Sequence, residues 1–272
     1  MDFKEKMTGF RSPDIKDYPE LKGYTGKQIY DGYIGCGGLY LVSEMVRLMN
    51  IKKGGIVLDL GCGLGAAALY LAKKFDVTVI AVDLWNSPET LAKKAYDTGY
   101  SNKVIPLQFD ITKNIPFAES YFDAIFCLNS LFLFGSEPEF IKRLLRTLRT
   151  GGTFCIGSEC FNREPDYEVI PEVYNFNWDW NIWDGCCSNY HSPQWWYSLI
   201  NNTGDIDIEY CEELKDGRVL FEDYALNYQE YMSKDVIETG AVIPQDKLAE
   251  QIRYGIEFGL HPTLYILKGI KK

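Results

Sequence analysis

The sequence predicts an α/β fold, a seven-stranded sheet that is mostly parallel with an antiparallel last strand and carries helices on both faces. An apolar strand pattern from Val57 runs into a glycine-rich turn and leaves as a helix. From Ile56 onward, strand and helix patterns alternate, which is typical of a parallel sheet with right-handed crossovers. The strand patterns at 205–214 and 263–270 are joined without a helix that returns to the sheet, so we expect an antiparallel pairing there.

The individual elements follow from apolar periodicity and from helix-end signals. Ser87 and Pro88 match the cap and the first position of a helix, and Ser192-Pro193 does the same for a later short helix. The stretch LRTGGTF (148–154) is expected to close a helix on its glycines. We therefore predict further strands at 56–61, 77–82, 104–109, 122–129 and 153–159, and helices at 39–49, 65–75, 87–98 and 137–149.

Length and composition favour one large domain, because 272 residues of which 46% are apolar can bury a full core. The segment 1–50 contains a glycine cluster followed by a helix, which predicts an N-terminal helical lid or, alternatively, a helix that simply covers the sheet. Residues 51–272 then form the main domain, with substrate-covering insertions at 161–191 and 216–260. The charged N-terminal residues lack the apolar run of a signal peptide and no stretch reaches the length of a membrane span, so we expect a cytoplasmic protein without membrane contact.

Net charge and cysteine spacing narrow the classes of ligand and partner that the protein can bind. The net charge is −10, and residues 161–260 alone carry −14, whereas a nucleic-acid partner requires a basic surface. The eight cysteines include no CxxC pair and several lie in apolar strand patterns, which indicates reduced packing residues rather than a metal site. A thiolate site for a soft metalloid lacks ligand spacing. We expect a small-molecule substrate, no nucleic acid and no metal, and the oligomeric state is not predicted.

The glycine turn is the main functional signal. Gly61, Gly63 and Gly65 permit a tight turn and close approach of a ligand, and the helix that follows points free N–H groups at that ligand. Asp83, at the end of the next strand, is placed as an acceptor for ribose hydroxyls. GCGLGA also satisfies the dehydrogenase pattern, so the glycines alone leave a nicotinamide oxidoreductase open.

Three further features favour S-adenosylmethionine. Asp59 lies two residues before Gly61, where a negative charge suits the cationic amino and sulfonium groups of that cofactor better than a pyrophosphate. Asp110, at the end of the third strand, offers an acceptor near an adenine edge. The chain also ends with an expected antiparallel strand pair instead of a second mononucleotide-binding half.

The segments VLDLGCGLGAA, AVDLW, LQFDIT, FDAIFCLNSLFLF and LRTGGTF, which span 56–160, resemble in order the motifs of class I S-adenosylmethionine-dependent methyltransferases with a Rossmann-like sheet. The flanking GGLYL (37–41) and HSPQWW (191–196) resemble a bacterial subgroup likened to cyclopropane-synthase and quinone methyltransferases. The resemblance implies methyl transfer, although function is decided by sites more than by folds. A protein that binds the cofactor without catalysis and acts through partners is the alternative.

The resemblance also implies a cofactor site. Gly61, Cys62 and Gly63 would lie along the methionine part, and Asp83 would hold both ribose hydroxyls. The alternative for Trp85 is packing, and for Asn129 a cap of the strand end. The full cofactor set is Tyr33, Asp59, Gly61, Cys62, Gly63, Asp83, Leu84 and Trp85 beside the adenine, Asp110 and Ile111 at its amino edge and face, and Asn129 near the methionine end.

The acceptor side is less defined. The amino-directed signature of Asn or Asp, two prolines and an aromatic is absent after the fourth strand, where the chain has NSLF, and this favours a small-molecule acceptor. Methyl transfer is an in-line displacement that mainly requires alignment. If a proton must leave, His191 and Glu159 are the catalytic candidates, against a structural role in a turn for His191 and an ordinary paired carboxylate for Glu159.

Aromatic residues concentrate after the fifth strand. Five of the six tryptophans lie between Trp178 and Trp196, among several acidic residues. This composition predicts a pocket for an amine or another cationic or aromatic metabolite, or else the packing of an insertion against the sheet.

Overall fold

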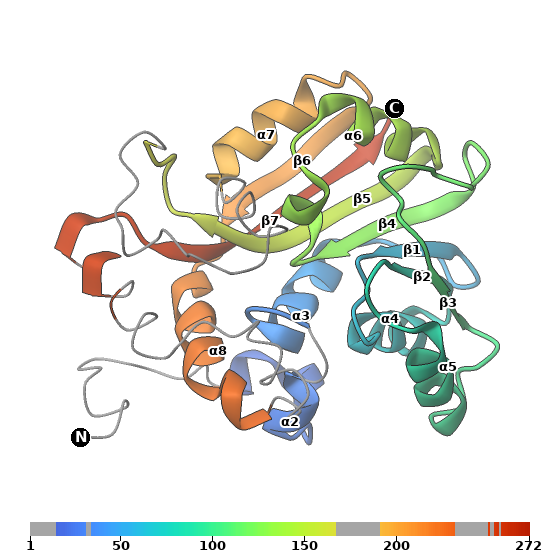
Figure 1. Cartoon of the computed structure of the whole chain (residues 1–272), viewed down its shortest axis with the longest axis horizontal. Coiled ribbons are helices and arrows are strands. Elements are labelled where there is room, and N and C mark those ends of the chain that lie inside the picture. Colours follow the sequence, from blue (N-terminus) through green and yellow to red (C-terminus); the bar gives the residue numbers. More distant parts are fainter. Residues whose placement is uncertain (1–14, 31–33, 167–190, 232–249, 251–252, 256) are drawn as a thin grey trace.

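A single seven-stranded sheet organises the computed structural model, which describes residues 15–30, 34–166, 191–231, 250, 253–255 and 257–272 (Figure 1). The strand order is β3-β2-β1-β4-β5-β7-β6. Neighbours from β3 to β5 are parallel, and β7 is antiparallel to both β5 and β6, so the predicted sheet is confirmed. The strands are β1 (Ile56–Leu60), β2 (Thr78–Asp83), β3 (Val104–Gln108), β4 (Phe122–Leu128), β5 (Leu148–Phe161), β6 (Ile206–Glu213) and β7 (Pro262–Lys271).

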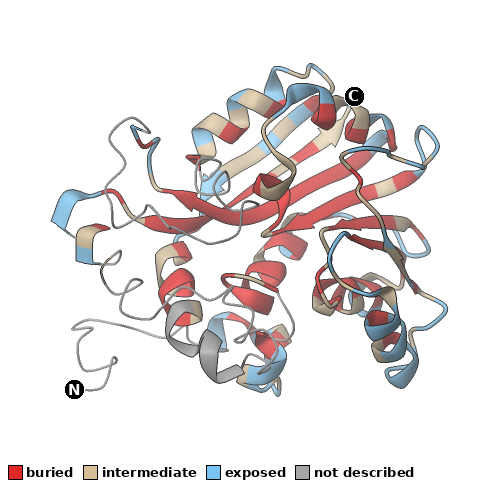
Figure 2. Ribbon diagram, in the orientation of Figure 1, coloured by how far each residue is buried: buried red, intermediate tan, exposed pale blue. Residues whose placement is uncertain are grey.

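Helices cover both faces of this sheet, as predicted. One face packs against α3, α4, α5 and α8, and the other against α6 and α7. Figure 2 shows the buried residues concentrated in the central strands between these layers. The helices are α2 (Gly26–Ile29), α3 (Gly38–Leu48), α4 (Ala66–Phe75), α5 (Pro88–Asp97), α6 (Pro138–Arg146), α7 (Pro193–Asn201) and α8 (Gly217–Tyr231), with the short 3-10 turns η1 (Ile15–Asp17), η2 (Pro19–Leu21) and η3 (Leu131–Phe134).

The fifth strand corrects two boundaries. The expected helix at 137–149 ends at Arg146, and β5 already begins at Leu148, so the LRTGGTF stretch belongs to the strand and does not close the helix. Leu148 is buried and pairs with Phe122, and the register then shifts. Pairing with β4 therefore extends the strand through this stretch despite the turn tendency of its glycines. Gly151 adopts a φ of 75°, which accommodates the irregular part of the strand.

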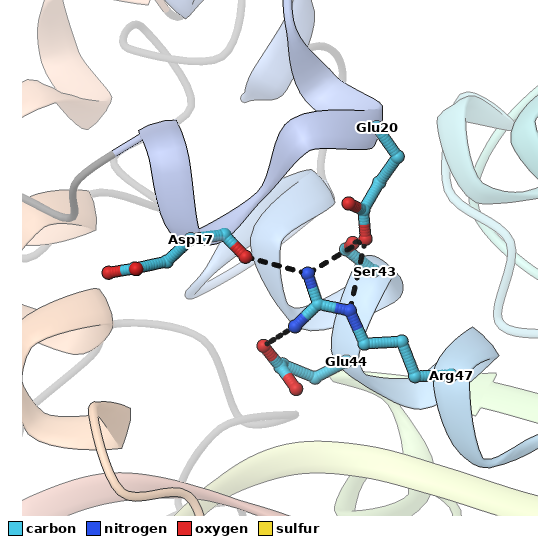
Figure 3. Close-up of polar contacts among 5 residues, drawn as sticks. All are labelled: Asp17, Glu20, Ser43, Glu44 and Arg47. Atoms are coloured by element: carbon cyan, nitrogen blue, oxygen red, sulfur yellow. Dashed lines mark hydrogen bonds and ion pairs between the residues drawn. The ribbon is translucent and has the colours of Figure 1, made fainter.

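The N-terminal segment is fastened to α3 through Arg47 (Figure 3). Its guanidinium donates to the Asp17 carbonyl oxygen at 2.7 Å, to Glu20 Oε1 at 3.2 Å and to Glu44 Oε1 at 2.6 Å. The Ser43 hydroxyl donates to the same Glu20 carboxylate. These contacts hold η1 and η2 against α3, which in turn packs on β5.

Candidate functional site

The glycine turn joins β1 to α4 at the carboxyl edge of the sheet. Its three glycines have φ values of 71° (Gly61), 55° (Gly63) and 81° (Gly65), which other residues rarely adopt. The N–H groups of Gly61 and Cys62 both donate to the Val82 carbonyl oxygen, at 2.9 and 3.0 Å, and so tie the turn to β2. The φ values and these two hydrogen bonds together fix the conformation of the turn backbone that a ligand would contact.

Asp83 closes this turn from the end of β2. Its Oδ2 accepts the Gly63 N–H at 2.9 Å, and its Oδ1 accepts the N–H groups of Trp85 and Asn86 and the Asn86 side-chain amide, each at 2.9 Å. A carboxylate offers about four acceptor positions in all, so Oδ2 keeps capacity for a hydroxyl donor. Leu84 and Trp85 are 46% and 51% exposed beside it, which presents apolar surface next to the carboxylate.

Asp59 is the most unusual charge in the region. Its side chain is 1% exposed, and Oδ2 has no hydrogen-bond partner among the described residues. Burial, and secondarily the nearby Asp83, raise the pKa of this carboxyl to about 7. A small cavity adjoins it, lined by Ile34, Asp59, Gly61, Cys62, Ala66, Ala67 and Leu128. A buried acceptor beside a cavity fits a donor group, and a cationic donor best of all.

Asn129 supplies a second acceptor directly after β4. Its Nδ2 donates to the carbonyl oxygens of Ile34 and Cys36 at 2.9 and 2.8 Å, while its Oδ1 is buried without a partner among the described residues. Its backbone has a φ of 48°, and its N–H donates to the Gly157 carbonyl oxygen at 2.8 Å. Asn129 thus holds the segment 34–36 at the end of β4, and its contact with the methionine end of the cofactor stays a prediction.

Glu159, in β5, contacts the same segment 34–36. Its carboxylate is 7% exposed, Oε1 accepts the Cys36 N–H at 3.4 Å, and Oε2 accepts the Ser158 hydroxyl at 3.2 Å. Burial raises the pKa of this carboxyl. Among the described residues, none of the ion pairs includes Glu159. A buried carboxylate in this position suits a positively charged group of a bound ligand.

Asp110 and Ile111 follow β3 in different environments. Asp110 Oδ1 accepts the Thr112 N–H at 3.1 Å and its hydroxyl at 2.6 Å, and Oδ2 pairs with Lys113 at 3.0 Å. The hydroxyl bond from Thr112, with help from Lys113, lowers the pKa of Asp110. Ile111 is 2% exposed and belongs to the core on the α6 side. The local turn accounts for these Asp110 contacts, so its contact with adenine stays a prediction.

His191 lies immediately before α7. Its Nδ1 is 2.6 Å from Glu164 Oε1, and its ring stacks on Trp195 with 3.5 Å between centroids and an interplanar angle of 4°. Burial lowers the pKa of the imidazole, and Glu164 opposes that effect. His191 is therefore held by a carboxylate and an indole that the sequence did not associate with it.

Several contributors were not predicted. Asn86 and Ser130 lie beside predicted residues in AVDLWN and LNS, so adjacency was an available signal. Ser130 donates to the Gly61 carbonyl oxygen at 3.0 Å. Cys36 gave no signal, because its partner Glu159 is distant in the sequence. Glu164 was predicted only as one of the acidic residues among the tryptophans, and its contact with His191 was not predicted. The predicted Tyr33 lies outside the described residues, as do the tryptophans between 178 and 183.

Comparison with known proteins places this geometry in a family context. Residues 58–156 match the family model described as a methyltransferase domain. Phosphoethanolamine N-methyltransferase 1 of Arabidopsis thaliana is 32% identical over 155 residues, which are 56% of this chain and 29% of that protein. Four further curated relatives are also phosphoethanolamine N-methyltransferases, and this chain spans 26–33% of the length of these five proteins.

Solved structures share the fold over more of the chain. A phosphoethanolamine N-methyltransferase 2 of Haemonchus contortus in complex with S-adenosyl-L-methionine has a TM-score of 0.64 at 20% identity, covering 95% of this chain and 60% of its own. A geranyl diphosphate methyltransferase in complex with GPP and sinefungin has the same TM-score at 15% identity, covering 86% and 78%. No helix in the described part of the chain combines the length and apolar character that crossing a membrane requires.

Proposed function

Because the chain carries a methyltransferase domain of the class I S-adenosylmethionine-dependent type, we propose that it transfers the methyl group of that cofactor to a small-molecule acceptor. One observation carries the proposal. Asp59 Oδ2, in β1, and Asn129 Oδ1, directly after the neighbouring strand β4, are both buried without a hydrogen-bond partner among the described residues. Two such acceptors suit a cationic amino group far better than a pyrophosphate.

The remaining cofactor contacts are distributed along the strand ends. Asp83 Oδ2 accepts a ribose hydroxyl in addition to the Gly63 N–H. The exposed side chains of Leu84 and Trp85 flank the adenine. In this proposal the cofactor-binding residues are Tyr33, Asp59, Gly61, Cys62, Gly63, Asp83, Leu84, Trp85, Asp110, Ile111 and Asn129.

The proposed acceptor is an amine or another cationic metabolite. Glu159 supports this choice, because it is a buried carboxylate near the carboxyl end of β5 that accepts from a neutral N–H and a hydroxyl. A cationic group beside it would be stabilised in a site that excludes water. The similarity to phosphoethanolamine N-methyltransferases agrees with an amine acceptor.

Residues of this chain mainly align the reactants. The cofactor, when bound, supplies a methyl group already activated by its sulfonium. Glu159 orients the amine by its charge, and the segment 34–36 excludes water above the strand ends. His191, whose lowered pKa keeps it neutral near pH 7, takes the proton that the acceptor nitrogen gives up.

In this proposal, the segments that flank the sheet cover the site where the acceptor binds. Residues 1–50 act as an N-terminal lid, and the insertions 161–191 and 216–260 close over the acceptor. The attachment of segment 34–36 by Asn129 and Glu159 supports the first assignment. Most of 161–191, including the tryptophan-rich stretch, lies outside the described residues.

A methyl-transfer screen tests the proposed function. The protein is incubated with methyl-labelled S-adenosylmethionine and pools of amines, thiols, phenols and carboxylates, with D83A as the blank. We expect label transfer to an amine, together with release of S-adenosylhomocysteine. Cofactor binding without transfer to any pool would instead favour a silent binding protein, and binding of NADH in place of S-adenosylmethionine would favour an oxidoreductase.

A further inference from the structure

We propose that Glu164 is a positioning residue: it fixes the imidazole of His191 as the tautomer protonated on Nδ1, so that Nε2 carries the lone pair that takes the acceptor's proton. The inference rests on the proposed function only for the last clause. The tautomer and the orientation are properties of this chain by itself, and they can be measured without turnover.

The contact between the two side chains defines the tautomer. Glu164 Oε1 lies 2.6 Å from His191 Nδ1, a distance at which one of the two atoms donates a hydrogen to the other. An ionised carboxylate has no hydrogen to give, so Nδ1 donates. In a neutral imidazole with hydrogen on Nδ1, the lone pair is on Nε2.

The carboxylate is itself fixed by the start of α7. Its second oxygen, Oε2, accepts the Ser192 N–H at 2.8 Å and the Ser192 hydroxyl at 2.9 Å. Ser192 is also the N-cap of α7, since its side chain accepts the Trp195 N–H. Both oxygens of Glu164 are thus engaged, and the helix N-terminus favours their negative charge.

The imidazole plane is fixed as well. The ring lies parallel to Trp195 at 3.5 Å and edge-on to Trp196 at 6.2 Å between centroids. Trp196 is 1% exposed and His191 is 8% exposed. Rotation of the ring would break the stacking and the carboxylate contact together, so one orientation is strongly preferred.

The place of this pair in the fold matches an acceptor site. Glu164 lies three residues beyond the end of β5, the strand that carries Glu159. Asn162 ties this stretch to the start of β7, because its N–H donates to the His261 carbonyl oxygen at 3.1 Å and its Oδ1 accepts the His261 N–H at 2.9 Å. The carboxyl ends of the strands are where ligands bind in open α/β sheets.

The charges around the ring predict how it titrates. Among the described residues, Glu164 faces the ring from the segment after β5, and the uncharged Ser192, Trp195 and Trp196 face it from the start of α7. Burial lowers the pKa of His191, and the Glu164 carboxylate raises it. When the acceptor N–H bond breaks, its hydrogen passes to Nε2 and its electron pair stays on the acceptor nitrogen. The resulting imidazolium is then stabilised by Glu164.

Nitrogen-15 NMR of the imidazoles tests the proposal directly. The chain has two histidines, so H261Q assigns both signals. We expect wild-type His191 to be protonated on Nδ1 at neutral pH. In E164Q, the amide can present either an acceptor or a donor to the ring, so we expect a mixed tautomer and a pKa about one unit lower. A wild-type His191 protonated on Nε2, or an unchanged signal in E164Q, would overturn the proposal.

A matched control and a second variant keep this test decisive. Glu213 Oε1 lies 3.9 Å from His261 Nε2, so E213Q should move the His261 titration and leave His191 as in the wild type. If E164Q does not fold, E164D retains the carboxylate but withdraws it by one methylene, and a partial loss of the Nδ1 tautomer is then expected. A fully wild-type His191 signal in folded E164D counts against the proposal.

Turnover measurements separate the positioning of His191 by Glu164 from the role of His191 as the proton acceptor. In E164Q, the acidic limb of the kcat/KM profile should move with the measured His191 pKa, while the Kd for S-adenosylmethionine stays within about twofold of the wild type. If NMR shows the tautomer change but H191Q keeps full turnover, Glu164 still positions His191, and it is the proton-accepting role that fails. Absence of methyl transfer from every acceptor pool refutes the proposed function without affecting the NMR result.

Discussion

The two ends of the candidate site are built in different ways. At the β1–β2 end, the contacts join residues close in sequence, since Asp83 accepts from Gly63, 20 positions away, and from Trp85 and Asn86, two and three positions away. At the β4–β5 end, Asn129 holds Ile34 across 95 positions, and Glu159 holds Cys36 across 123. The first end is therefore a property of one βαβ unit, whereas the second exists only when the N-terminal segment has docked.

The two ends also differ in how they use charge. Asp83 is surrounded by donors, so its carboxylate is a satisfied part of the backbone turn. Asp59 and Glu159 are buried carboxylates whose pKa values are raised by burial, which signals a cost that a cationic ligand would offset. Asp83 therefore combines a structural role in the turn with its proposed ribose contact, whereas Asp59 and Glu159 are expected to act mainly on a ligand, and substitutions can separate these roles.

Substitution of Gly61 should have the largest effect. In G61A, the new Cβ would lie 2.5 Å from Ser130 Cβ and Oγ, on a backbone with φ of 71°. We expect a loss of about 4 kcal/mol of unfolding free energy and no measurable cofactor binding. Gly54 has a similar φ of 79°, but no atom lies within 4 Å of a Cβ added there. The control G54A should therefore lower the free energy of unfolding by only about 1 kcal/mol. Equal losses in chemical denaturation would show that the turn is not tightly packed.

Asp59 should make the protein less stable as pH rises. Its folded pKa of about 7 lies above its unfolded value, so the folded state binds more protons between about pH 4 and pH 7. The free energy of unfolding should therefore fall through this window, by on the order of 3 kcal/mol, and D59N should remove that part of the slope. Urea unfolding at pH 5 and pH 7.5 measures it. A D59N slope identical to the wild type would rule out the titration of Asp59.

Glu159 should distinguish acceptor binding from cofactor binding. In E159Q, the buried charge is lost while the size and the contact with the Cys36 N–H are preserved. We expect KM for a cationic acceptor to rise about 30-fold, equivalent to about 2 kcal/mol, with the Kd for S-adenosylmethionine unchanged. The exposed Glu212 supplies the matched control, E212Q, which should behave as the wild type. A parallel loss of cofactor affinity would mean that the two ends are not separable.

Arg47 should give the smallest effect. R47K keeps the charge but cannot bond Asp17, Glu20 and Glu44 at once, so docking of the N-terminal segment should weaken by about 1 kcal/mol. The control K53A removes an ion pair in which the lysine is 82% exposed and should change stability very little. Thermal unfolding compares them, and equal Tm values for R47K and K53A would contradict a fastening role for the fork in Figure 3.

The local end of the site was accessible from sequence because its physics is local. The apolar strand pattern that runs into glycines predicted the turn. The next apolar pattern, which ends in Asp83, predicted β2 with a carboxylate at its end. The same reasoning set the β5 boundary wrongly, because glycine turn propensity in LRTGG was weighed without the pairing that β4 offers to Leu148. Strand pairing of this kind is not visible in a single segment.

The distant end was accessible only in part. Asn129 and Glu159 were named from their positions at strand ends, but nothing in the sequence indicated that both would hold segment 34–36. Glu164 and His191 are 27 positions apart with the tryptophan-rich stretch between them, so neither adjacency nor periodicity relates them. Side-chain contacts that depend on how loops return to the sheet require the folded chain.

Calorimetric titration of the wild type and D59N with S-adenosylmethionine, and of the wild type with NADH, tests the central claim most directly. We predict saturable one-site binding of S-adenosylmethionine, weakened at least about tenfold in D59N because a buried charge-assisted contact is lost, and no binding of NADH. Saturable NADH binding, or an S-adenosylmethionine affinity that D59N leaves unchanged, would contradict the assignment of Asp59 and the glycine turn to a cationic cofactor.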